Sequence, residues 1–242
     1  MGALKSAIGD MVITFLWVFL SATFGLQTAA IISAAGIHGV AWAPPVITTL
    51  LVFVSVSIFT LIGELLGGAS FNPTGNAAFY TAGVPGDSLF SMALRFPAQA
   101  AGAVGGAMAI LEVVPDKYKH MIGGPALRVD LHTGAIAEGI LSFLITFSVL
   151  LIILRGPRRL LAKTFLLAIV TVSLVIAGSK YTGPAMNPAI AFGWAYIYSS
   201  HNSWDHFYVY WISSFVGAIL AALAFRVFFP PPRPQKKKQK KA

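Results

Sequence analysis

The dipeptide Asn-Pro opens two related stretches of this chain, Phe71-Asn72-Pro73-Thr74 and Met186-Asn187-Pro188-Ala189, which lie 115 residues apart. The same spacing relates Gly68 to Gly183. A single Asn-Pro dipeptide is an ordinary turn signal. Two of them at one repeat spacing, each inside an apolar stretch, indicate instead that the chain holds two copies of one unit and that both dipeptides share a functional role.

Composition assigns the chain to a membrane. Of its 242 residues 57% are hydrophobic and 10% are charged, with a mean hydropathy of +0.77, whereas a soluble domain carries about 25% charged residues. The absence of cysteine excludes disulfides, thiol catalysis and cysteine metal sites. The histidines show no spacing typical of a metal site. We therefore expect an all-α membrane protein that is not an enzyme and needs no metal or cofactor.

Six apolar stretches are long enough to cross a bilayer, which takes about 20 residues. They lie near residues 7–34, 44–66, 88–114, 133–154, 161–179 and 204–229. Three spans fall in each half of the chain, and the halves cover about 1–115 and 130–229. Because three is an odd number, the second copy must enter the membrane upside down, which predicts an inverted repeat.

The basic residues predict the orientation. The net charge of +9 could indicate nucleic acid, but the charges concentrate in the loop Arg155-Gly156-Pro157-Arg158-Arg159 and in a lysine-rich tail at 230–242. This is the positive-inside pattern of a membrane protein and argues against a nucleic-acid partner. The loop joins the fourth and fifth spans, so we expect both termini in the cytosol. Arg95 counts toward the same cytosolic surplus of charge.

Each Asn-Pro dipeptide begins a helix that is too short to span. The segments 73–81 and 188–196 each hold about nine residues, or roughly 13 Å of helix, against about 30 Å of hydrocarbon. Proline is favoured at the first helical position, and the asparagine before it can cap free backbone N–H groups. Two half-helices entering from opposite faces would bring Asn72 and Asn187 together near the midplane.

Further residues carry a family resemblance. Each half opens with an acidic residue followed by Thr/Ser-Phe, in Asp10-x3-Thr14-Phe15 and Glu138-x3-Ser142-Phe143. Tyr181-Thr182-Gly183 precedes the second Asn-Pro dipeptide, and Tyr210-Trp211 opens the sixth span. With these residues and the paired dipeptides, nearly the whole chain resembles the aquaporin (major intrinsic protein) family. The small size, the threonine in the first box and the lysine-rich end are similar to the plant small basic intrinsic proteins.

The resemblance implies a fold and a function. The fold would be an aquaporin-like right-handed bundle of six transmembrane helices plus two re-entrant half-helices, forming one channel domain over residues 1–242. The assembly would be a homotetramer surrounded by membrane lipids. The solute would be water or another small uncharged molecule.

The implied pore centre consists of the two boxes, Asn72, Pro73, Thr74, Asn187, Pro188 and Ala189. Asparagine amides donate hydrogen bonds to water, and each half-helix N-terminus carries about +0.5 charge. A water molecule held by both amides must turn its hydrogens outward, which interrupts a proton wire. Two roles stay open for the Thr74 hydroxyl: a hydrogen bond to loop backbone, or contact with the permeating water.

The resemblance also places a selectivity filter at Val52, Val175, Pro184 and Ile190. The family usually carries an arginine at the position of Ile190, so this filter would be apolar and uncharged. Cation exclusion would then depend on the half-helices. Lys180 lies nearby in sequence and leaves two alternatives: it replaces the lost charge, or it extends to solvent.

Two carboxylates, Asp10 and Glu138, lie inside the expected spans. A carboxylate within the membrane suggests a proton relay by default. The matching placement of these two in the two halves favours a structural role, in which they accept hydrogen bonds from the backbone of the re-entrant loops.

The tail joins a proline-rich spacer to lysines, of which Lys238 and Lys240 lie fifth and third from the end. This arrangement resembles the retrieval signals of endoplasmic reticulum membrane proteins. It implies that membrane as the location and a retrieval coat as a partner. The alternatives are a merely solvated tail, and attraction to anionic lipid at about 1 kcal/mol per charge.

Three functions compete, and a passive channel for water or a similar solute fits best. An ion-coupled secondary transporter also uses inverted repeats and broken helices. Coupling to ions, however, needs a titratable or ion-binding group at the midplane, where this sequence offers two neutral amides. A non-conducting membrane scaffold is the remaining alternative.

Overall fold

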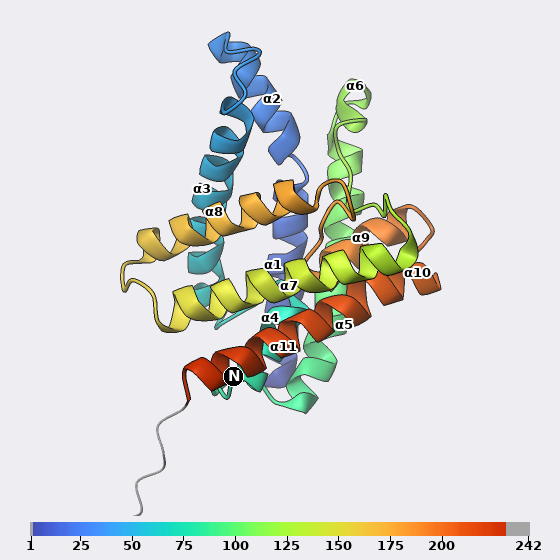
Figure 1. Ribbon diagram of the computed structural model, residues 1–242. Helices are drawn as coiled ribbons and strands as arrows, with labels where there is room; N and C mark the ends of the chain where they lie inside the picture. The colour runs from blue at the N-terminus through green and yellow to red at the C-terminus, as the bar shows by residue number, and fades with distance from the viewer. Residues whose placement is uncertain (1, 231–242) are drawn as a thin grey trace, which may run out of the picture.

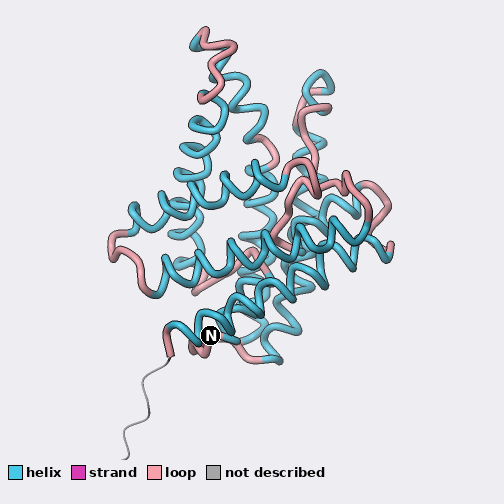
Figure 2. The backbone as a smooth tube through the Cα atoms, viewed as in Figure 1, coloured by secondary structure: helices cyan, strands magenta, loops and turns pink. Residues whose placement is uncertain are grey.

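The structure, a computed structural model, describes residues 2–230. Every regular element in this part of the chain is a helix (Figure 1, Figure 2). Six helical stretches are long and apolar enough to cross a membrane, which confirms the predicted all-helical membrane fold. The predicted retrieval residues Lys238 and Lys240 lie outside the described residues.

The six spans begin and end within a few residues of the predicted bounds. The first span consists of α1 (Ala3–Ser21) and its continuation α2 (Phe24–Ala35), followed by α3 (Ala43–Leu65), α5 (Leu89–Val113), α7 (Leu131–Leu154) and α8 (Leu160–Gly178). The last span combines α10 (Trp204–His206), the π-helical turn η1 (Phe207–Ile212) and α11 (Ser213–Phe228). A short helix, α6 (Asp116–Lys119), lies between α5 and α7.

Two shorter helices, α4 (Pro73–Thr81) and α9 (Pro188–Ile197), hold 9 and 10 residues. Each begins at the proline of an Asn-Pro box. The asparagine before it keeps an extended backbone, with a φ of −139° at Asn72 and −155° at Asn187. The chain therefore changes from loop to helix at each asparagine, as the boxes predict.

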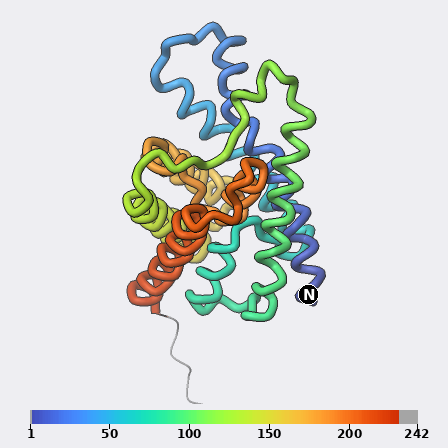
Figure 3. The backbone as a smooth tube through the Cα atoms, turned by 90° about the vertical axis from the view of Figure 1, so that its right-hand side faces the viewer, coloured from blue at the N-terminus to red at the C-terminus, as the bar shows by residue number. Residues whose placement is uncertain are grey.

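Contacts between helices come in corresponding pairs. Helix α1 packs against α5 as α7 packs against α11, and α5 contacts α9 as α11 contacts α4. Helix α3 pairs with α8. Figure 1 shows α1, α3 and α5 running up the view while α7, α8 and α11 cross them obliquely, and Figure 3 shows α1 and α5 side by side along one edge. Each short helix thus rests on a long helix of the opposite half.

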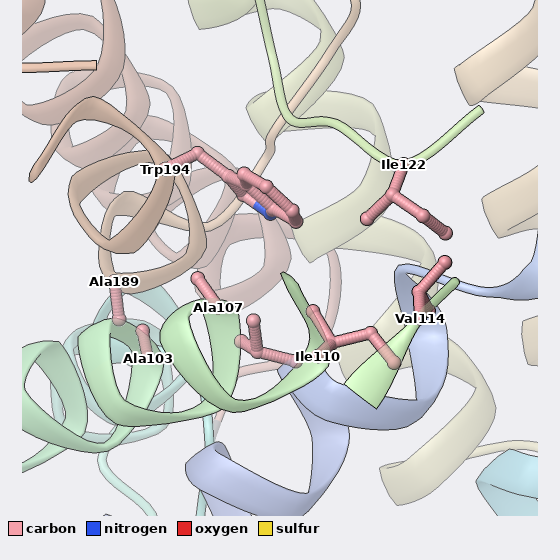
Figure 4. Packing of buried hydrophobic residues seen from close by; sticks show 8 residues of the cluster. Ala103, Ala107, Ile110, Val114, Ile122, Ala189 and Trp194 are labelled. Carbon is pink, nitrogen blue, oxygen red and sulfur yellow. The ribbon is translucent and has the colours of Figure 1, made fainter. Parts of the chain in front are cut away.

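Small residues bring α9 onto α5. Ala189 and Trp194 of α9 pack in one cluster with Ala103 and Ala107 of α5 (Figure 4). Gly193 approaches so closely that a Cβ there would lie 2.7 Å from the backbone carbonyl carbon of Ala103. This contact fixes the position of α9 and of the asparagine that begins it.

Glycines allow the paired long helices to approach. A Cβ at Gly102 of α5 would lie 2.2 Å from the carbonyl oxygen of Met11, and a Cβ at Gly217 of α11 would lie 2.1 Å from that of Gly139. Non-bonded heavy atoms are most stable at about 3.5–4.0 Å. Only glycine fits at these two positions without moving a helix.

Alanine at Gly102 or Gly217 should therefore push the paired helices apart. Overpacking of this kind costs about 1–3 kcal/mol, so both variants should unfold at a lower temperature in detergent than the unchanged protein. Gly25→Ala is the matched control, because a Cβ at Gly25 meets nothing within 4 Å. Equal stability of all three variants would contradict the packing argument.

Candidate functional site

Both short helices are capped by the asparagine that precedes them. Asn72 Oδ1 accepts a hydrogen bond from the backbone N–H of Thr74 at 3.0 Å. Asn187 Oδ1 accepts from the N–H groups of Ala189 at 3.0 Å and Ile190 at 3.4 Å. The proline at the first helical position has no N–H to satisfy. Each cap therefore uses the side-chain oxygen of the asparagine and leaves its amide nitrogen free to donate to other groups.

The two caps are also tied to each other. Asn72 Nδ2 donates to the carbonyl oxygen of Met186 at 3.0 Å, and Asn187 Nδ2 donates to that of Phe71 at 2.7 Å. Each acceptor is the residue just before the opposite asparagine. These reciprocal hydrogen bonds hold the N-terminal ends of α4 and α9 together, so that two positive helix ends meet at one place.

A cavity of about 470 Å³ opens beside this junction and is lined by both asparagines. Most of its wall is apolar, and it is formed by α3, α7 and α8 together with the two re-entrant loops and α4, with Val56, Ile145 and Leu167 among the lining side chains. Sequence reasoning assigned no role to Glu64, yet this exposed carboxylate also lines the cavity. No cluster of three or more metal-ligating side chains occurs within residues 2–230.

The four predicted filter residues do not all reach this cavity. Val52 and Ile190 line it. Val175 is 41% exposed and lies outside the lining, although it continues the face of α8 that presents Leu167 and Thr171 at intervals of four residues. Pro184 is buried and packs against Gly178. Lys180, which was considered as a replacement charge, is exposed and is not part of the lining.

The Thr74 hydroxyl has a side-chain partner that neither of the two roles predicted from the sequence includes, and Thr74 also lines the cavity. It donates to Asn72 Oδ1 at 2.7 Å, and the residue is 1% exposed. The Asn72 oxygen thus accepts two hydrogen bonds from one residue, whereas the Asn187 oxygen accepts from two successive backbone N–H groups. Sequence spacing could not reveal this difference, because it depends on the side-chain rotamer of Thr74.

Glu138 supports the second box. Its carboxylate accepts hydrogen bonds from the backbone N–H groups of Ala185 and Met186 and from the hydroxyl of Thr182 at 2.7 Å. Met186 has a φ of 47°, a left-handed conformation that is costly for a side chain other than glycine. The carboxylate therefore stabilises a strained residue whose carbonyl oxygen orients Asn72.

Asp10 supports the first box but has a cation beside it. Its carboxylate accepts from the backbone N–H of Ser70 at 2.8 Å and from Gln99 at 2.6 Å. It also forms two hydrogen bonds with Arg95, each 2.7 Å long. Arg95, which the sequence placed among the cytosolic charges, is instead buried at 7% exposure. The Asp10–Arg95 ion pair was not foreseen, because the two residues lie on different spans.

Arg95 extends this network to the loop before α5. Its Nη1 atom donates to Asp87 at 2.6 Å, and Asn76 donates to the other oxygen of the same carboxylate at 2.8 Å. Burial by itself would raise the pKa of Asp87, but the hydrogen bonds from Asn76 and Arg95 outweigh it and hold that pKa below the ordinary value. A charged network therefore anchors α4 at Asn76, one turn after its cap.

The second half has no matching cation. Within residues 2–230 no basic side chain forms an ion pair with Glu138. Tyr210 stands 115 residues after Arg95, and its hydroxyl donates to the carbonyl oxygen of Thr182 at 2.9 Å. Hydrogen bonds to Glu138 and from Tyr210 hold this re-entrant loop, whereas in the first half an ion pair accompanies the hydrogen bonds.

A polar junction with a cavity beside it, enclosed by apolar helices, is typical of a membrane channel or transporter. Irregular backbone within a membrane is tolerated where protein buries it or where it borders an aqueous path. Comparison with known sequences narrows this class. The profile of the family described as Major intrinsic protein matches residues 1–225, and the chain therefore belongs to the major intrinsic protein family of membrane channels.

Individual relatives agree with this membership. The chain is 77% identical to Aquaporin SIP1-1 of Arabidopsis thaliana and 71% identical to Probable aquaporin SIP1-2 of the same plant, over 100% of both sequences in each case. Aquaporin SIP1-2 of Zea mays is 56% identical over 98% of both sequences. The predicted resemblance to the plant small basic intrinsic proteins is thereby confirmed.

A solved structure supports the fold. The X-ray structure of the aquaglyceroporin from Plasmodium falciparum matches with a TM-score of 0.71, covering 95% of this chain and 98% of that chain. The sequences are 19% identical, so this likeness concerns the arrangement of helices.

Replacement of Arg95 should show how much the first box depends on the ion pair. Arg95→Met leaves Asp10 buried without its cation, which should lower the free energy of unfolding by about 3–5 kcal/mol. The control is Arg226→Met, because Arg226 is exposed and makes one hydrogen bond, to the carbonyl oxygen of Thr81 at 3.2 Å. Denaturation in mixed micelles measures both. Similar decreases in the free energy of unfolding of the two variants would contradict the role of the Arg95–Asp10 ion pair in supporting the first box.

Proposed function

We propose that the protein is a passive channel for water or another small uncharged solute. Its pore is centred on the two boxes, Asn72, Pro73, Thr74, Asn187, Pro188 and Ala189. The observation that carries the proposal is the pair of reciprocal hydrogen bonds that hold both asparagines at the wall of one cavity. Family membership and the aquaporin names of the relatives support the same class of solute.

The two amides act as donors toward the solute. Each side-chain amide carries two N–H groups, and one of them is committed to the opposite box. The second N–H of Asn72 and of Asn187 is available to a solute oxygen. A water molecule bonded to both turns its hydrogens away from the centre, which interrupts proton transfer along the file. The ends of α4 and α9 add about +0.5 charge each, which excludes cations.

In this proposal, a selectivity filter lies along the path away from the two asparagines. It consists of Val52, Val175, Pro184 and Ile190. All four side chains are apolar. Val52 and Ile190 border the cavity, and Val175 continues the same face of α8 beyond it. Ion exclusion therefore depends on the helix ends and the asparagines.

The proposal extends to the organisation of the chain. The corresponding helix contacts support an inverted repeat of halves at about 1–115 and 130–229 within a single channel domain. The basic loop 155–159 supports a cytosolic location for both termini. Resemblance to the family supports a homotetramer surrounded by lipid.

The carboxylates disfavour an ion-coupled transporter. Asp10 is neutralised by Arg95, and Glu138 is occupied by three donors from residues 182–186. Neither lines the cavity, so neither is available to bind a coupling ion there; the carboxylate that does line it is that of Glu64, next to the last residue of α3. A non-conducting scaffold, for its part, would need no cavity beside two free amide donors.

The purified protein in lipid vesicles tests these alternatives. We expect stopped-flow light scattering to show water flux above that of empty vesicles, with a low activation energy and no dependence on ion gradients. Parallel measurements with hydrogen peroxide, ammonia and glycerol identify the preferred solute. A flux that requires an ion gradient indicates a transporter, and no flux of any solute above empty vesicles indicates a scaffold.

Asn187→Asp tests the pore centre in the same vesicles. The substitution removes the amide donor to Phe71 and places a negative charge where two positive helix ends meet. We expect solute flux to fall about fivefold or more, since leaving the partly buried Phe71 carbonyl without its donor costs about 1–3 kcal/mol, and cation leak to rise. Asn202→Asp in an exposed loop is the control. Unchanged flux and leak in N187D would count against the assigned centre.

We also propose residence in the endoplasmic reticulum membrane, with Lys238 and Lys240 read by a retrieval coat. Such signals are read from the carboxyl end. A short neutral extension after Ala242 should therefore shift the full-length protein toward later membranes, whereas lipid attraction would be unaffected. Fluorescence microscopy of an internally labelled protein, with and without the extension, makes the comparison; identical distributions argue against retrieval.

A further inference from the structure

We propose that Trp17 is a selectivity-determining residue of the pore. Its indole N–H donates to the permeating solute, and its ring limits the width of the path beside Ile190. The proposal rests on the channel function proposed above and specifies the solute class. That class is a small neutral molecule with an oxygen acceptor, of the size of water or hydrogen peroxide, with glycerol-sized polyols excluded.

Trp17 lies on α1 and lines the same cavity as the two asparagines. The residue is 8% exposed and packs in one cluster with Ile190. Ile190 occupies the position where the family resemblance led us to expect an arginine. An aromatic ring from α1 therefore stands next to the point at which the usual cationic donor is missing.

The orientation of the indole is fixed by aromatic neighbours. It stacks on Phe71 with ring centroids 4.6 Å apart and an interplanar angle of 17°. Phe59 and Phe24 meet it edge to face, with centroid distances of 5.1 and 6.2 Å. Such pairs each contribute about 0.5–1.5 kcal/mol beyond area burial. The ring cannot turn away from the cavity without breaking several of these contacts.

The same stack connects Trp17 to the pore centre. Phe71 contributes the carbonyl oxygen that accepts from Asn187 Nδ2 at 2.7 Å. Trp17 thus packs on the residue that orients one of the two amide donors. A solute that moves away from the asparagines along this wall of the cavity passes the indole.

The indole N–H is available for a solute. Within residues 2–230 it donates to no other residue, yet it is not sealed from solvent as the buried and unpartnered N–H of Trp211 is. A buried tryptophan usually finds a partner for this donor. In a residue that is otherwise buried and lines a cavity, the accessible N–H is directed to the cavity's contents.

The corresponding position in the second half carries an aliphatic side chain. The matched carboxylates Asp10 and Glu138 place Ile145 in the second half where Trp17 stands in the first, and Ile145 lines the cavity as well. The indole N–H is therefore not repeated at the corresponding position of the second half. A solute with an oxygen acceptor binds the indole N–H, whereas a polyol with several hydroxyl groups would leave some of them unsatisfied against the largely apolar wall.

Permeability ratios in vesicles test the assignment with the full-length protein. Trp17→Phe keeps an aromatic ring and removes the N–H, so water and hydrogen peroxide permeability should fall about threefold or more. Trp17→Leu replaces the ring with a smaller side chain and widens the path, so the ratio of glycerol to water permeability should rise about tenfold. Trp204→Phe is the control, because Trp204 is 64% exposed and does not line the cavity; its permeabilities should match those of the unchanged protein.

The outcomes separate two failures. Unchanged permeabilities in W17F, with flux of the unchanged protein present, overturn the donor role, and an unchanged glycerol ratio in W17L overturns the width role. Absence of flux in the unchanged protein rejects the channel function itself. Gel filtration and circular dichroism verify that each variant is folded, and Trp17→Tyr supplies a second variant without the indole N–H if phenylalanine is not tolerated.

Discussion

Two reciprocal hydrogen bonds hold the centre of this protein together. Asn72 donates to the carbonyl oxygen of Met186, and Asn187 donates to that of Phe71. A buried amide or carbonyl without a partner is costly in an apolar environment. The N-terminal ends of α4 and α9 can remain inside a bundle of apolar helices because each supplies the acceptor that the other needs. The contacts of α4 with α11 and of α9 with α5 lock the halves around this junction.

The two re-entrant loops reach similar geometry by different physical means. In the first half, Asp10 is paired with Arg95, and the network extends to Gln99 and Asp87. In the second half, Glu138 has hydrogen-bond donors but forms no ion pair with any residue of the described range 2–230, and it holds Met186 in a left-handed conformation. A buried ion pair is sensitive to the loss of either partner, whereas the second loop depends on backbone geometry. The two halves thus share the asparagine caps but differ in the contacts that hold the loops before them.

The wall of the cavity explains how a path without a charged filter residue can remain selective. Ile190 brings no charge to the side where Trp17 and Val52 lie. The positive potential at the centre comes from the ends of α4 and α9, and it acts strongly because the surroundings are apolar. Neutral solutes meet amide and indole donors along an otherwise hydrophobic wall. Cations meet two helix ends, and the carboxylate that lines the cavity, that of Glu64, belongs to the C-terminal end of α3.

Much of this architecture follows from local sequence. Apolar runs of about 20 residues define the spans, and Asn-Pro defines the start of each half-helix because capping and the missing proline N–H are local effects. Repeat spacing related Asn72 to Asn187. The pairing of Arg95 with Asp10, the partner of the Thr74 hydroxyl and the presence of Trp17 in the cavity wall were decided only by tertiary structure. These contacts join residues through the rotation and approach of whole helices or through a single rotamer, and neither quantity is encoded in the spacing of one segment.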